Sequence, residues 1–409
     1  ENHILISCTR RSIFIISLWE EADMALATNS VIIDDPRDRA PAGVPRLVNL
    51  LIGGRDTVAS NEATFERFSP VSGDLVTIAA AAHLEDVIAA ANAAAAAFPL
   101  WSQTGPDHRR RILDRTADLL LARAQEFIAA MMAETGATRE WSSFNVELSA
   151  KILREAAAST TQVGGAIIPT DMAGKTSFAY RQPAGVCLAI APWNAPVILG
   201  VRSIAIALAC GNTVVLKSSE LCPATHRLIG DVLQEAGLPG GVINIISNAP
   251  ADASAIMETL IAHPVVRRVN FTGSTRVGRI IAQTAAKHLK RCLLELGGKA
   301  AFVVLDDADL DEAVKAAAFG AYFNQGQICM STERIIVMDE VADAFVDRFL
   351  AKAKTLRAGD PTYGELPLGS LVTAESARRV RGLIEDAVAK GAMLLTGGEN
   401  HDAMMDAAV

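Results

Sequence analysis

The chain has 409 residues, of which 50% are hydrophobic and 21% are charged, and its formal net charge at neutral pH is -8. This length predicts about two or three domains with a large apolar core. The acidic balance gives no electrostatic reason to expect nucleic acid as a partner.

The first 45 residues are expected to form an N-terminal extension, non-native or disordered in part. Residues 4–19 contain apolar runs that Arg10 and Arg11 interrupt, and acidic residues follow at once. The apolar stretch is too short to span a bilayer, and it carries only part of a signal-peptide pattern. We therefore expect residues 1–23 to be non-native or translated from upstream of the gene, and Met24 to be the natural start of a cytoplasmic protein.

The segment from residue 46 to residue 164 is expected to be mainly helical. Helical patterns cover Ile78–Phe98, the stretch from Gly105-Pro106 to Gly136, and Phe144–Val163. Proline is tolerated in the first turn of a helix, and glycine commonly follows the last turn. A polar, glycine-containing segment over residues 165–185 then predicts a β-hairpin.

After Gly185 short apolar strands alternate with helices. Strands are expected over Val186–Ala191, Thr213–Lys217, Val242–Ile246, Arg268–Phe271 and Cys292–Leu296, with helices over Pro196–Ala209, Pro223–Ala236, Ala251–His263 and Val277–Leu289 between them. This alternation predicts an α/β fold with a doubly wound parallel sheet. A second α/β run has strands over Ala301–Leu305 and Glu333–Met338 and helices over Leu310–Phe323, Val341–Leu356 and Ala374–Lys390.

The six cysteines are scattered, without a C-x-x-C pair. In a chain of this length such scatter predicts free thiols in a reducing cytosol rather than a disulfide framework. The seven histidines form no pair that is spaced for metal binding. We therefore expect no metal site.

Two polar segments at strand ends could bind a nucleotide, which a doubly wound sheet favours. In Phe271–Gly278 a strand ends, a glycine turns the chain, and Ser or Thr can cap a new helix, whose start can bind a phosphate. The alternative to phosphate binding is an ordinary strand–turn–helix connection without a ligand. Lys217 ends a strand and Glu220 follows, so the carboxylate could accept hydrogen bonds from ribose hydroxyls. The alternative there is a surface ion pair.

Three other residues could carry chemistry. Asn194 follows a strand and is a candidate oxyanion donor, although Asn also favours turns. Glu295 lies in an apolar strand, where burial would raise its pKa toward that of a general base, unless it belongs to a buried ion pair. Cys329 follows Gly326 in a polar turn that could expose a reactive thiolate. Most lone cysteines are instead small core residues.

In order and spacing these segments resemble the aldehyde dehydrogenase superfamily. The matching blocks are Ala191-Pro192-Trp193-Asn194, Lys217-Ser218-Ser219-Glu220, Phe271–Thr275, Glu295-Leu296-Gly297-Gly298-Lys299 and Gly326-Gln327-Ile328-Cys329. The stretches His288–Glu295, Gln327–Arg334 and Trp141–Val146 resemble more specifically the salicylaldehyde, benzaldehyde and vanillin dehydrogenases, of which salicylaldehyde dehydrogenase looks most similar.

The resemblance implies a mechanism and a cofactor. Cys329 would attack an aldehyde, Asn194 would hold the oxyanion, and Glu295 would activate water to release a carboxylic acid. NAD is favoured over NADP because Glu220 should repel a 2′-phosphate. The implied cofactor-binding residues are Ile190, Pro192, Trp193, Lys217, Glu220, Gly273, Ser274, Gly278 and Leu296. Trp141, Phe144 and Trp193 are candidate walls of an aromatic-substrate pocket, with core packing as the alternative.

The resemblance also implies a domain organisation. Residues 46–164 and 186–296 would form an NAD-binding domain, 165–185 an oligomerisation hairpin, and 297–409 a catalytic domain. The complete protein would then be a homodimer or homotetramer, without a membrane partner. Relatives continue beyond the position of Val409 with a Glu-x-Phe-Gly-Pro motif, so we expect the sequence to be C-terminally truncated. The competing functions are a coenzyme A-acylating relative, which Glu295 argues against, and an inactive NAD-binding protein.

Overall fold

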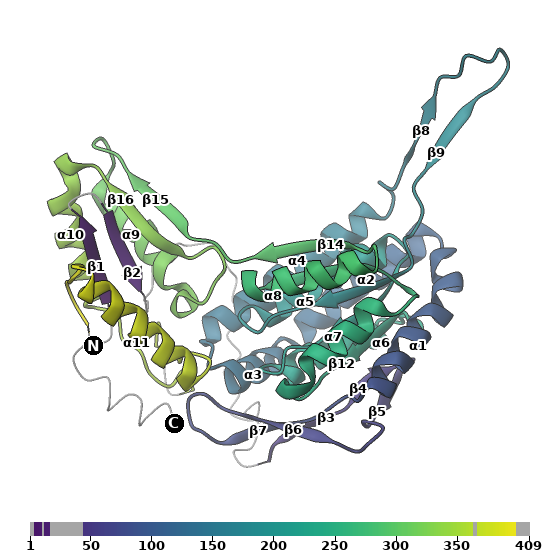
Figure 1. Cartoon of the computed structure of the whole chain (residues 1–409), viewed down its shortest axis with the longest axis horizontal. Coiled ribbons are helices and arrows are strands. Elements are labelled where there is room, and N and C mark those ends of the chain that lie inside the picture. The colour runs from purple at the N-terminus through teal and green to yellow at the C-terminus, as the bar shows by residue number, and fades with distance from the viewer. Residues whose placement is uncertain (1–3, 10–11, 17–43, 363–365, 398–409) are drawn as a thin grey trace.

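The computed structural model describes residues 4–9, 12–16, 44–362 and 366–397. It has a large sheet covered by helices, a smaller sheet with its own helices, and a two-stranded arm that projects away from both (Figure 1). The predicted α/β class and the predicted doubly wound parallel sheet are confirmed. No helix within the described ranges is long and apolar enough to cross a membrane.

The large sheet has seven strands in the order β14-β13-β10-β11-β12-β4-β5. Its parallel strands are β10 (Val186–Ile190), β11 (Thr213–Lys217), β12 (Ile243–Ile246), β13 (Val266–Gly273) and β14 (Arg291–Leu296), and its antiparallel edge is formed by β4 (Leu50–Ile52) and β5 (Arg55–Thr57). Strands β10 and β11 are buried along their whole length, as expected for parallel strands covered on both faces. The strand order reverses between β10 and β13, and ligands of such sheets bind in the crevice outside the carboxyl ends at this point.

Helices cover both faces of the large sheet. One apolar core includes residues of α2 (Pro106–Ala122), α3 (Ala124–Thr135), α4 (Arg139–Ser159), α5 (Pro196–Ala209) and α6 (Pro223–Glu235). The other core includes residues of α1 (Leu84–Ser102), α7 (Ala253–Ala262) and α8 (Thr275–Lys287). The sheet therefore holds its strand ends rigidly between two packed layers.

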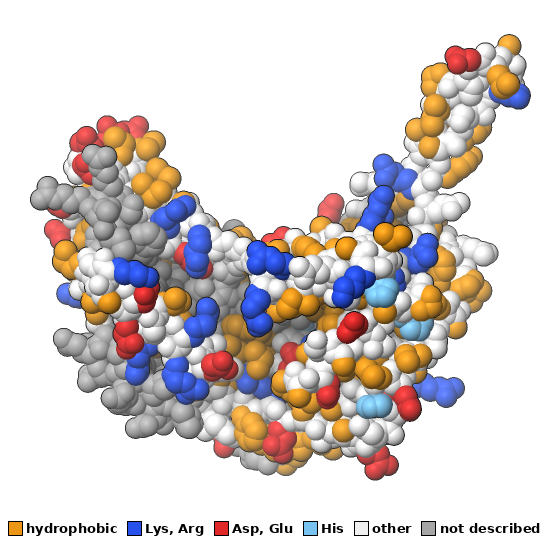
Figure 2. Space-filling model, in the orientation of Figure 1, with side chains coloured by type: hydrophobic (Ala, Val, Ile, Leu, Met, Phe, Trp, Pro, Cys, Tyr) orange, Lys and Arg blue, Asp and Glu red, His pale blue; other side chains and the backbone are white. Residues whose placement is uncertain are grey.

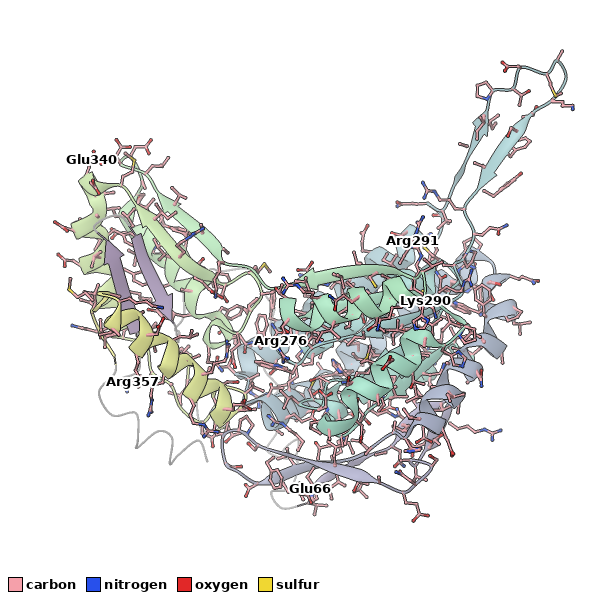
Figure 3. The ribbon with its side chains drawn as sticks, viewed as in Figure 1. Glu66, Arg276, Lys290, Arg291, Glu340 and Arg357 are labelled. Carbon is pink, nitrogen blue, oxygen red and sulfur yellow. The ribbon has the colours of Figure 1, made fainter. Side chains whose placement is uncertain are left out.

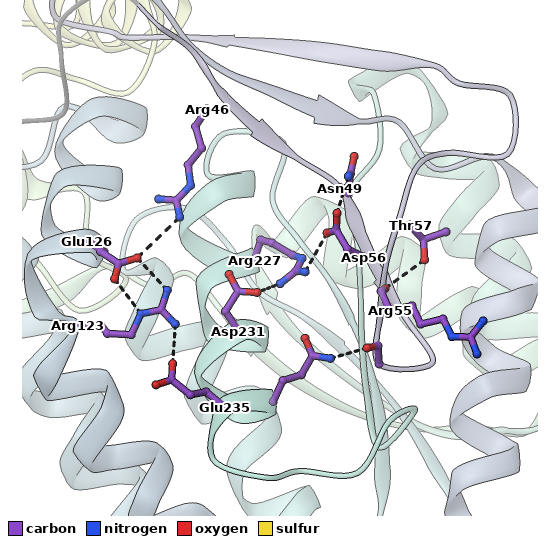
Figure 4. Close-up of polar contacts among 12 residues, drawn as sticks. Arg46, Asn49, Arg55, Asp56, Thr57, Arg123, Glu126, Arg227, Asp231 and Glu235 are labelled. Carbon is purple, nitrogen blue, oxygen red and sulfur yellow. Dashed lines mark hydrogen bonds and ion pairs between the residues drawn. The ribbon is translucent and has the colours of Figure 1, made fainter.

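Three of the expected helices differ clearly from the structure, and one of them is the helix expected over Phe144–Val163, which is α4. Residues at the start of the expected helix Ile78–Phe98 belong to strand β7 (Leu75–Ala80), and α1 begins only after His83, whose N–H donates to the Asp86 carboxylate at 2.8 Å. The helix expected from residue 105 to residue 136 is divided at Arg123, which leaves helical geometry and binds Glu126 at 2.8 Å (Figure 4). At β7 the alanine-rich pattern extends back over the end of the strand. At Arg123 apolar residues at helical spacing continue across the break.

The smaller sheet has the order β15-β16-β2-β1-β17. Its elements are β1 (Ile4–Thr9), β2 (Ser12–Ile16), β15 (Ala300–Val304), β16 (Thr332–Val337), β17 (Met393–Leu394), α9 (Leu310–Tyr322), α10 (Asp339–Ala353) and α11 (Ala374–Ala389). Thus part of the expected N-terminal extension forms strands that pair with β16 and β17. Met24 and the other residues from 17 to 43 lie outside the described residues.

Two further small sheets flank the molecule. A three-stranded sheet consists of β3 (Arg46–Val48), β7 and β6 (Thr64–Phe68). The expected hairpin is present as β8 (Gly165–Ile168) and β9 (Ser177–Tyr180), which pair antiparallel in the projecting arm. Apolar side chains lie along this arm (Figure 2), among them Ile167, which is 73% exposed, and Tyr180, which is 76% exposed.

Glu134 is a buried polar anchor between α3, strand β7 and the start of α6. Its carboxylate accepts hydrogen bonds from the backbone N–H groups of Ala224 (2.8 Å) and Thr225 (3.0 Å). It also accepts from the hydroxyls of Thr225 (2.7 Å) and Thr77 (3.0 Å). The first N–H groups of a helix have no partner within the helix, so Glu134 satisfies donors that would otherwise be buried and unpaired.

Replacing Glu134 with alanine should lower the free energy of unfolding by about 3 kcal/mol or more, because the buried donors at the start of α6 lose their acceptor. The matched change Glu126→Ala, on the same helix, removes only surface ion pairs (Figure 4) and should cost about 1 kcal/mol or less. Urea denaturation of both variants measures the difference. Equal losses would contradict the anchoring role of Glu134.

Candidate active site

A cavity of about 790 Å³ opens where the strand order of the large sheet reverses. It is lined by eight of the predicted site residues: Pro192, Trp193, Asn194, Gly273, Ser274, Glu295, Leu296 and Cys329. Residues of α11, among them Ser376, Arg379 and Val380, line it as well. The fold therefore brings the predicted nucleophile, oxyanion donor, base and phosphate-binding turn to one cavity.

The loop before Cys329 has an unusual backbone. Asn324 and Gln325 adopt the left-handed region, with φ of 49° and 57°, inside the short 3₁₀ helix Phe323–Gly326. Such conformations cost about 1–3 kcal/mol each in non-glycine residues and persist only where surrounding contacts hold them. Here the Gln325 side chain donates to the Ser370 carbonyl at 2.9 Å. The loop leaves the Cys329 side chain partly buried in the cavity wall, as a free thiol.

Both the side chain and the backbone carbonyl of Asn194 form hydrogen bonds with the same loop. Its side-chain amide donates to the carbonyl oxygen of Gln327 at 2.8 Å. Its backbone carbonyl accepts from the Trp141 indole N–H at 2.9 Å and from the Asn324 amide at 3.0 Å. An Asn amide has two N–H donors, so one orients the group and the second is available to another acceptor.

Glu295 corrects one expectation. It lies in β14, the edge strand of the large sheet, where exposed and half-buried side chains alternate, and its side chain is exposed. The hypothesis of a carboxylate buried in an apolar strand is therefore wrong. Cys292, Leu294 and Leu296 pack against the core that includes α8, whereas Glu295 lies on the other face of β14, which the described residues leave exposed. Glu295 nevertheless lines the cavity that contains Cys329.

The turn that starts α8 has the expected features of an anion-binding helix start. Ser274 caps the helix, since its hydroxyl oxygen accepts from the Val277 N–H at 3.3 Å. Gly278 is buried against Leu296, and a Cβ there would lie 2.5 Å from a Leu296 methyl carbon, so glycine permits close packing beside Glu295. Arg276 lies near the start of α8 (Figure 3), where basic side chains gather on the surface (Figure 2).

Lys217 and Glu220 form an ion pair at the end of β11, outside the residues that line the cavity. Burial opposes ionisation of Glu220, but the Lys217 ammonium and hydrogen bonds, including one from Asn248 at 3.3 Å, hold the pKa of Glu220 below its usual range. The carboxylate is therefore charged at neutral pH. Ile190 is buried in the sheet between Lys217 and Phe271, so only its backbone end reaches the strand termini.

The aromatic candidates divide into two groups. Trp193 lines the cavity, whereas Trp141 and Phe144 do not. Trp141 is 3% exposed and its ring lies 4.9 Å from that of Phe323, at the start of the nucleophile loop. Phe144 is 39% exposed and stacks on Trp141 at 5.6 Å. Trp141 thus packs in the core and also positions Asn194, a role that the sequence pattern did not reveal.

No group of three or more potential metal-ligating side chains is close enough to hold an ion in the part of the chain that the structure describes.

The sequence pattern did not identify three residues that support the site, which are Asn324, Gln327 and Phe323. The only signal for them was their position next to Cys329, because their partners are distant in sequence.

Alkylation should separate Cys329 from the buried cysteines. Burial raises the pKa of Cys187 to about 11 and also raises the pKa of Cys222. Because the thiolate is the reactive form, iodoacetamide at pH 8 should label Cys187 and Cys222 about a hundredfold more slowly than the partly exposed Cys329. Peptide mass spectrometry over time measures the three rates. Labelling of Cys222 in the folded protein as fast as that of Cys329 would contradict this geometry.

Known proteins of similar sequence identify the family of this chain. The model of the aldehyde dehydrogenase family matches residues 57–409. A vanillin dehydrogenase of Pseudomonas fluorescens is 62% identical over 352 residues, which cover 86% of this chain and 73% of that protein.

Solved structures give the same result. A salicylaldehyde dehydrogenase from Pseudomonas putida G7, complexed with salicylaldehyde, has a TM-score of 0.85 and 49% identity, and the match covers 86% of this chain and 73% of that one. PnpE in complex with nicotinamide adenine dinucleotide has a TM-score of 0.82 and 37% identity, with 86% of this chain and 71% of that one covered. The chain belongs to the aldehyde dehydrogenase family and is an oxidoreductase.

Proposed function

We propose that this protein oxidises an aromatic aldehyde to the carboxylic acid, with Cys329 as the nucleophile and NAD as the hydride acceptor. The observation that carries the proposal is the single cavity that Cys329, Asn194 and Glu295 share with the turn at the start of α8. Acyl transfer through a thioester needs a nucleophile, an oxyanion donor and a water-activating base in one place.

The residues present fit a dinucleotide. The N–H groups at the start of α8 suit a pyrophosphate. The charged Glu220, held by Lys217 and Asn248, is suited to ribose hydroxyls. Gly273 and Ser274 line the cavity beside Pro192 and Trp193. When bound, NAD would supply the hydride acceptor that turns the Cys329 adduct into a thioester.

The chain's own residues would perform the remaining chemistry. The Cys329 thiolate forms a bond to the aldehyde carbon, and the carbonyl electron pair moves onto oxygen. The free N–H of the Asn194 amide and the Cys329 backbone N–H stabilise that oxyanion. After oxidation, Glu295 takes a proton from water as the water attacks the thioester carbon, and the thiolate of Cys329 leaves. Exposure of Glu295 gives it access to solvent water.

An aromatic substrate is supported by the relatives and by Trp193, whose side chain lines the cavity. The cluster of rings that contacts the start of the nucleophile loop does not line the cavity, and its members are Trp141, Phe144, Phe319 and Phe323. Identity is higher with the vanillin dehydrogenase, at 62%, than with the salicylaldehyde dehydrogenase structure, at 49%. A hydroxylated benzaldehyde is therefore the proposed substrate class, and the expected preference for salicylaldehyde stays a prediction.

The domain organisation, assembly and location are also proposals. Residues 46–164 and 186–296 would carry the cofactor, and 297–409 the nucleophile. The exposed apolar side chains of the arm, such as Phe178 at 53% exposure, suit contact with a second copy of the chain. We expect a homodimer or homotetramer in the cytoplasm.

Two substitutions test the proposed chemistry in the full-length protein. Cys329→Ala should lower kcat by about a thousandfold or more, because no covalent adduct can form. Glu295→Gln should keep one rapid turnover per site but stall at the thioester, since hydrolysis lacks its base. NADH absorbance with salicylaldehyde, vanillin, benzaldehyde and an aliphatic aldehyde measures both effects.

The matched control is Cys210→Ala, which removes a partly buried thiol outside the residues that line the cavity and should leave kcat unchanged. If the Cys329→Ala variant retained dehydrogenase activity, the proposed mechanism would be contradicted. Faster oxidation of the aliphatic aldehyde than of all three aromatic ones would overturn the proposed substrate class.

Glu220→Ser should shift cofactor preference toward NADP. Removing the carboxylate abolishes repulsion of a 2′-phosphate, so the ratio of kcat/KM for NADP to that for NAD should rise about tenfold or more. Glu155→Ser removes an exposed carboxylate from α4 and should leave this ratio unchanged. If the ratio is unchanged in Glu220→Ser, Glu220 does not select between NAD and NADP, which would contradict its proposed role.

A further inference from the structure

His226 is a fully buried histidine of α6 that the proposed chemistry does not use. Its Nδ1 accepts from the Ser219 backbone N–H at 3.2 Å and lies 3.2 Å from the Ser218 hydroxyl. Its Nε2 lies 3.1 Å from the backbone carbonyl oxygen of Pro196. Both ring nitrogens are therefore used, each by a different segment of backbone.

The partners assign the tautomer of the ring. The Ser219 N–H can only donate and the Pro196 carbonyl can only accept, so Nδ1 is the acceptor and Nε2 carries the proton. Burial lowers the pKa of His226 to about 4, and the nearby Lys217 ammonium acts in the same direction against the Pro196 carbonyl and Glu220. The ring is thus neutral at physiological pH and fits both of its partners.

The two backbone segments that His226 joins belong to different parts of the site. Ser218 and Ser219 lie between Lys217 and Glu220, the proposed ribose-binding pair. Pro196 is the first residue of α5 and lies two residues after Asn194, the proposed oxyanion donor. One neutral ring therefore connects the cofactor end of β11 to the start of α5.

The ring also has little freedom to move. It lies in the contact between α5 and α6, where a Cβ at Gly200 would be 3.3 Å from His226 Cδ2 and 2.5 Å from Ile229 Cδ1. The Cys222 sulfur also contacts the ring, at 3.8 Å from Nδ1 and 3.9 Å from Nε2. A ring held this closely can hold two loops at a constant separation.

We propose that His226 is a positioning residue. Through its two ring nitrogens it fixes the distance between the Lys217–Glu220 pair and the segment from Asn194 to Pro196. This inference rests on the proposed function. His226 touches neither substrate nor cofactor, and it acts through the backbone of Ser219 and Pro196.

Three variants of the full-length protein separate the effects of the two hydrogen bonds. His226→Gln places an N–H donor near Pro196, so kcat should stay near that of the unvaried protein while NADH binds about fivefold to tenfold more weakly. His226→Asn places an acceptor near Ser219, so NADH affinity should be kept while kcat falls about fivefold to tenfold. His226→Leu should lose both. NADH fluorescence titration and kcat per active site measure the two effects.

The control is Leu233→Ala, a buried change on the same helix, which should lower Tm without changing NADH affinity or kcat. If the unvaried protein binds no NADH, the proposed function fails. The inference about His226 is overturned if the wild-type protein binds NADH and all His226 variants have the same NADH affinity and kcat as the wild type. A lower Tm alone, as in Leu233→Ala, would overturn it as well. Failure of all three variants to fold would assign His226 to the core alone and would also overturn it.

Discussion

The candidate site depends on the hydrogen bonds that hold Asn194. Its carbonyl accepts from Trp141 on α4 and from Asn324 before the nucleophile, while its amide donates to the Gln327 carbonyl. These bonds join the end of β10 to a loop more than a hundred residues away in sequence, as the separations of 130 and 133 residues show. They also offset the strained backbone of that loop, because a left-handed Asn324 needs partners to stay in place.

Helix α6 supports the other half of the site. Glu134 satisfies its first N–H groups, and His226 connects it to the ends of β11 and α5. On its outer face, Arg227 pairs with Asp231 and with Asp56 of β5, at 3.1 Å from the latter (Figure 4). A helix that is fixed at its start, its inner face and its outer face can hold the ribose-binding pair in a constant place.

Much of the fold could be predicted because its signals are local. The helix Pro196–Ala209 and the strand Thr213–Lys217 were predicted with the boundaries that the structure has, since proline marks the helix start and a continuous apolar run marks a buried parallel strand. Strand β7 was missed because its Ile78–Ala80 end precedes an alanine-rich helix, and its pairing with β3 and β6 is not visible in the sequence.

The site shows the same division. Cys329 and Asn194 could be proposed from their places in a polar turn and at a strand end. The exposure of Glu295 could not, since it depends on which face of β14 packs against the core, and the apolar run does not show this. The hydrogen bond from the Trp141 indole N–H to Asn194 also could not be predicted, because the two residues lie 53 positions apart in the sequence.

The most direct test of this account is a double-mutant cycle on the two donors to the Asn194 carbonyl. Trp141→Phe keeps an aromatic ring and Asn324→Ala removes an amide, so each single variant leaves the other donor in place. We predict that the double variant loses more kcat/KM than the sum of the single losses, with a coupling of about 0.5–3 kcal/mol. Additive losses, within about 0.3 kcal/mol, would show that the Asn194 carbonyl is not the shared anchor and would contradict the account.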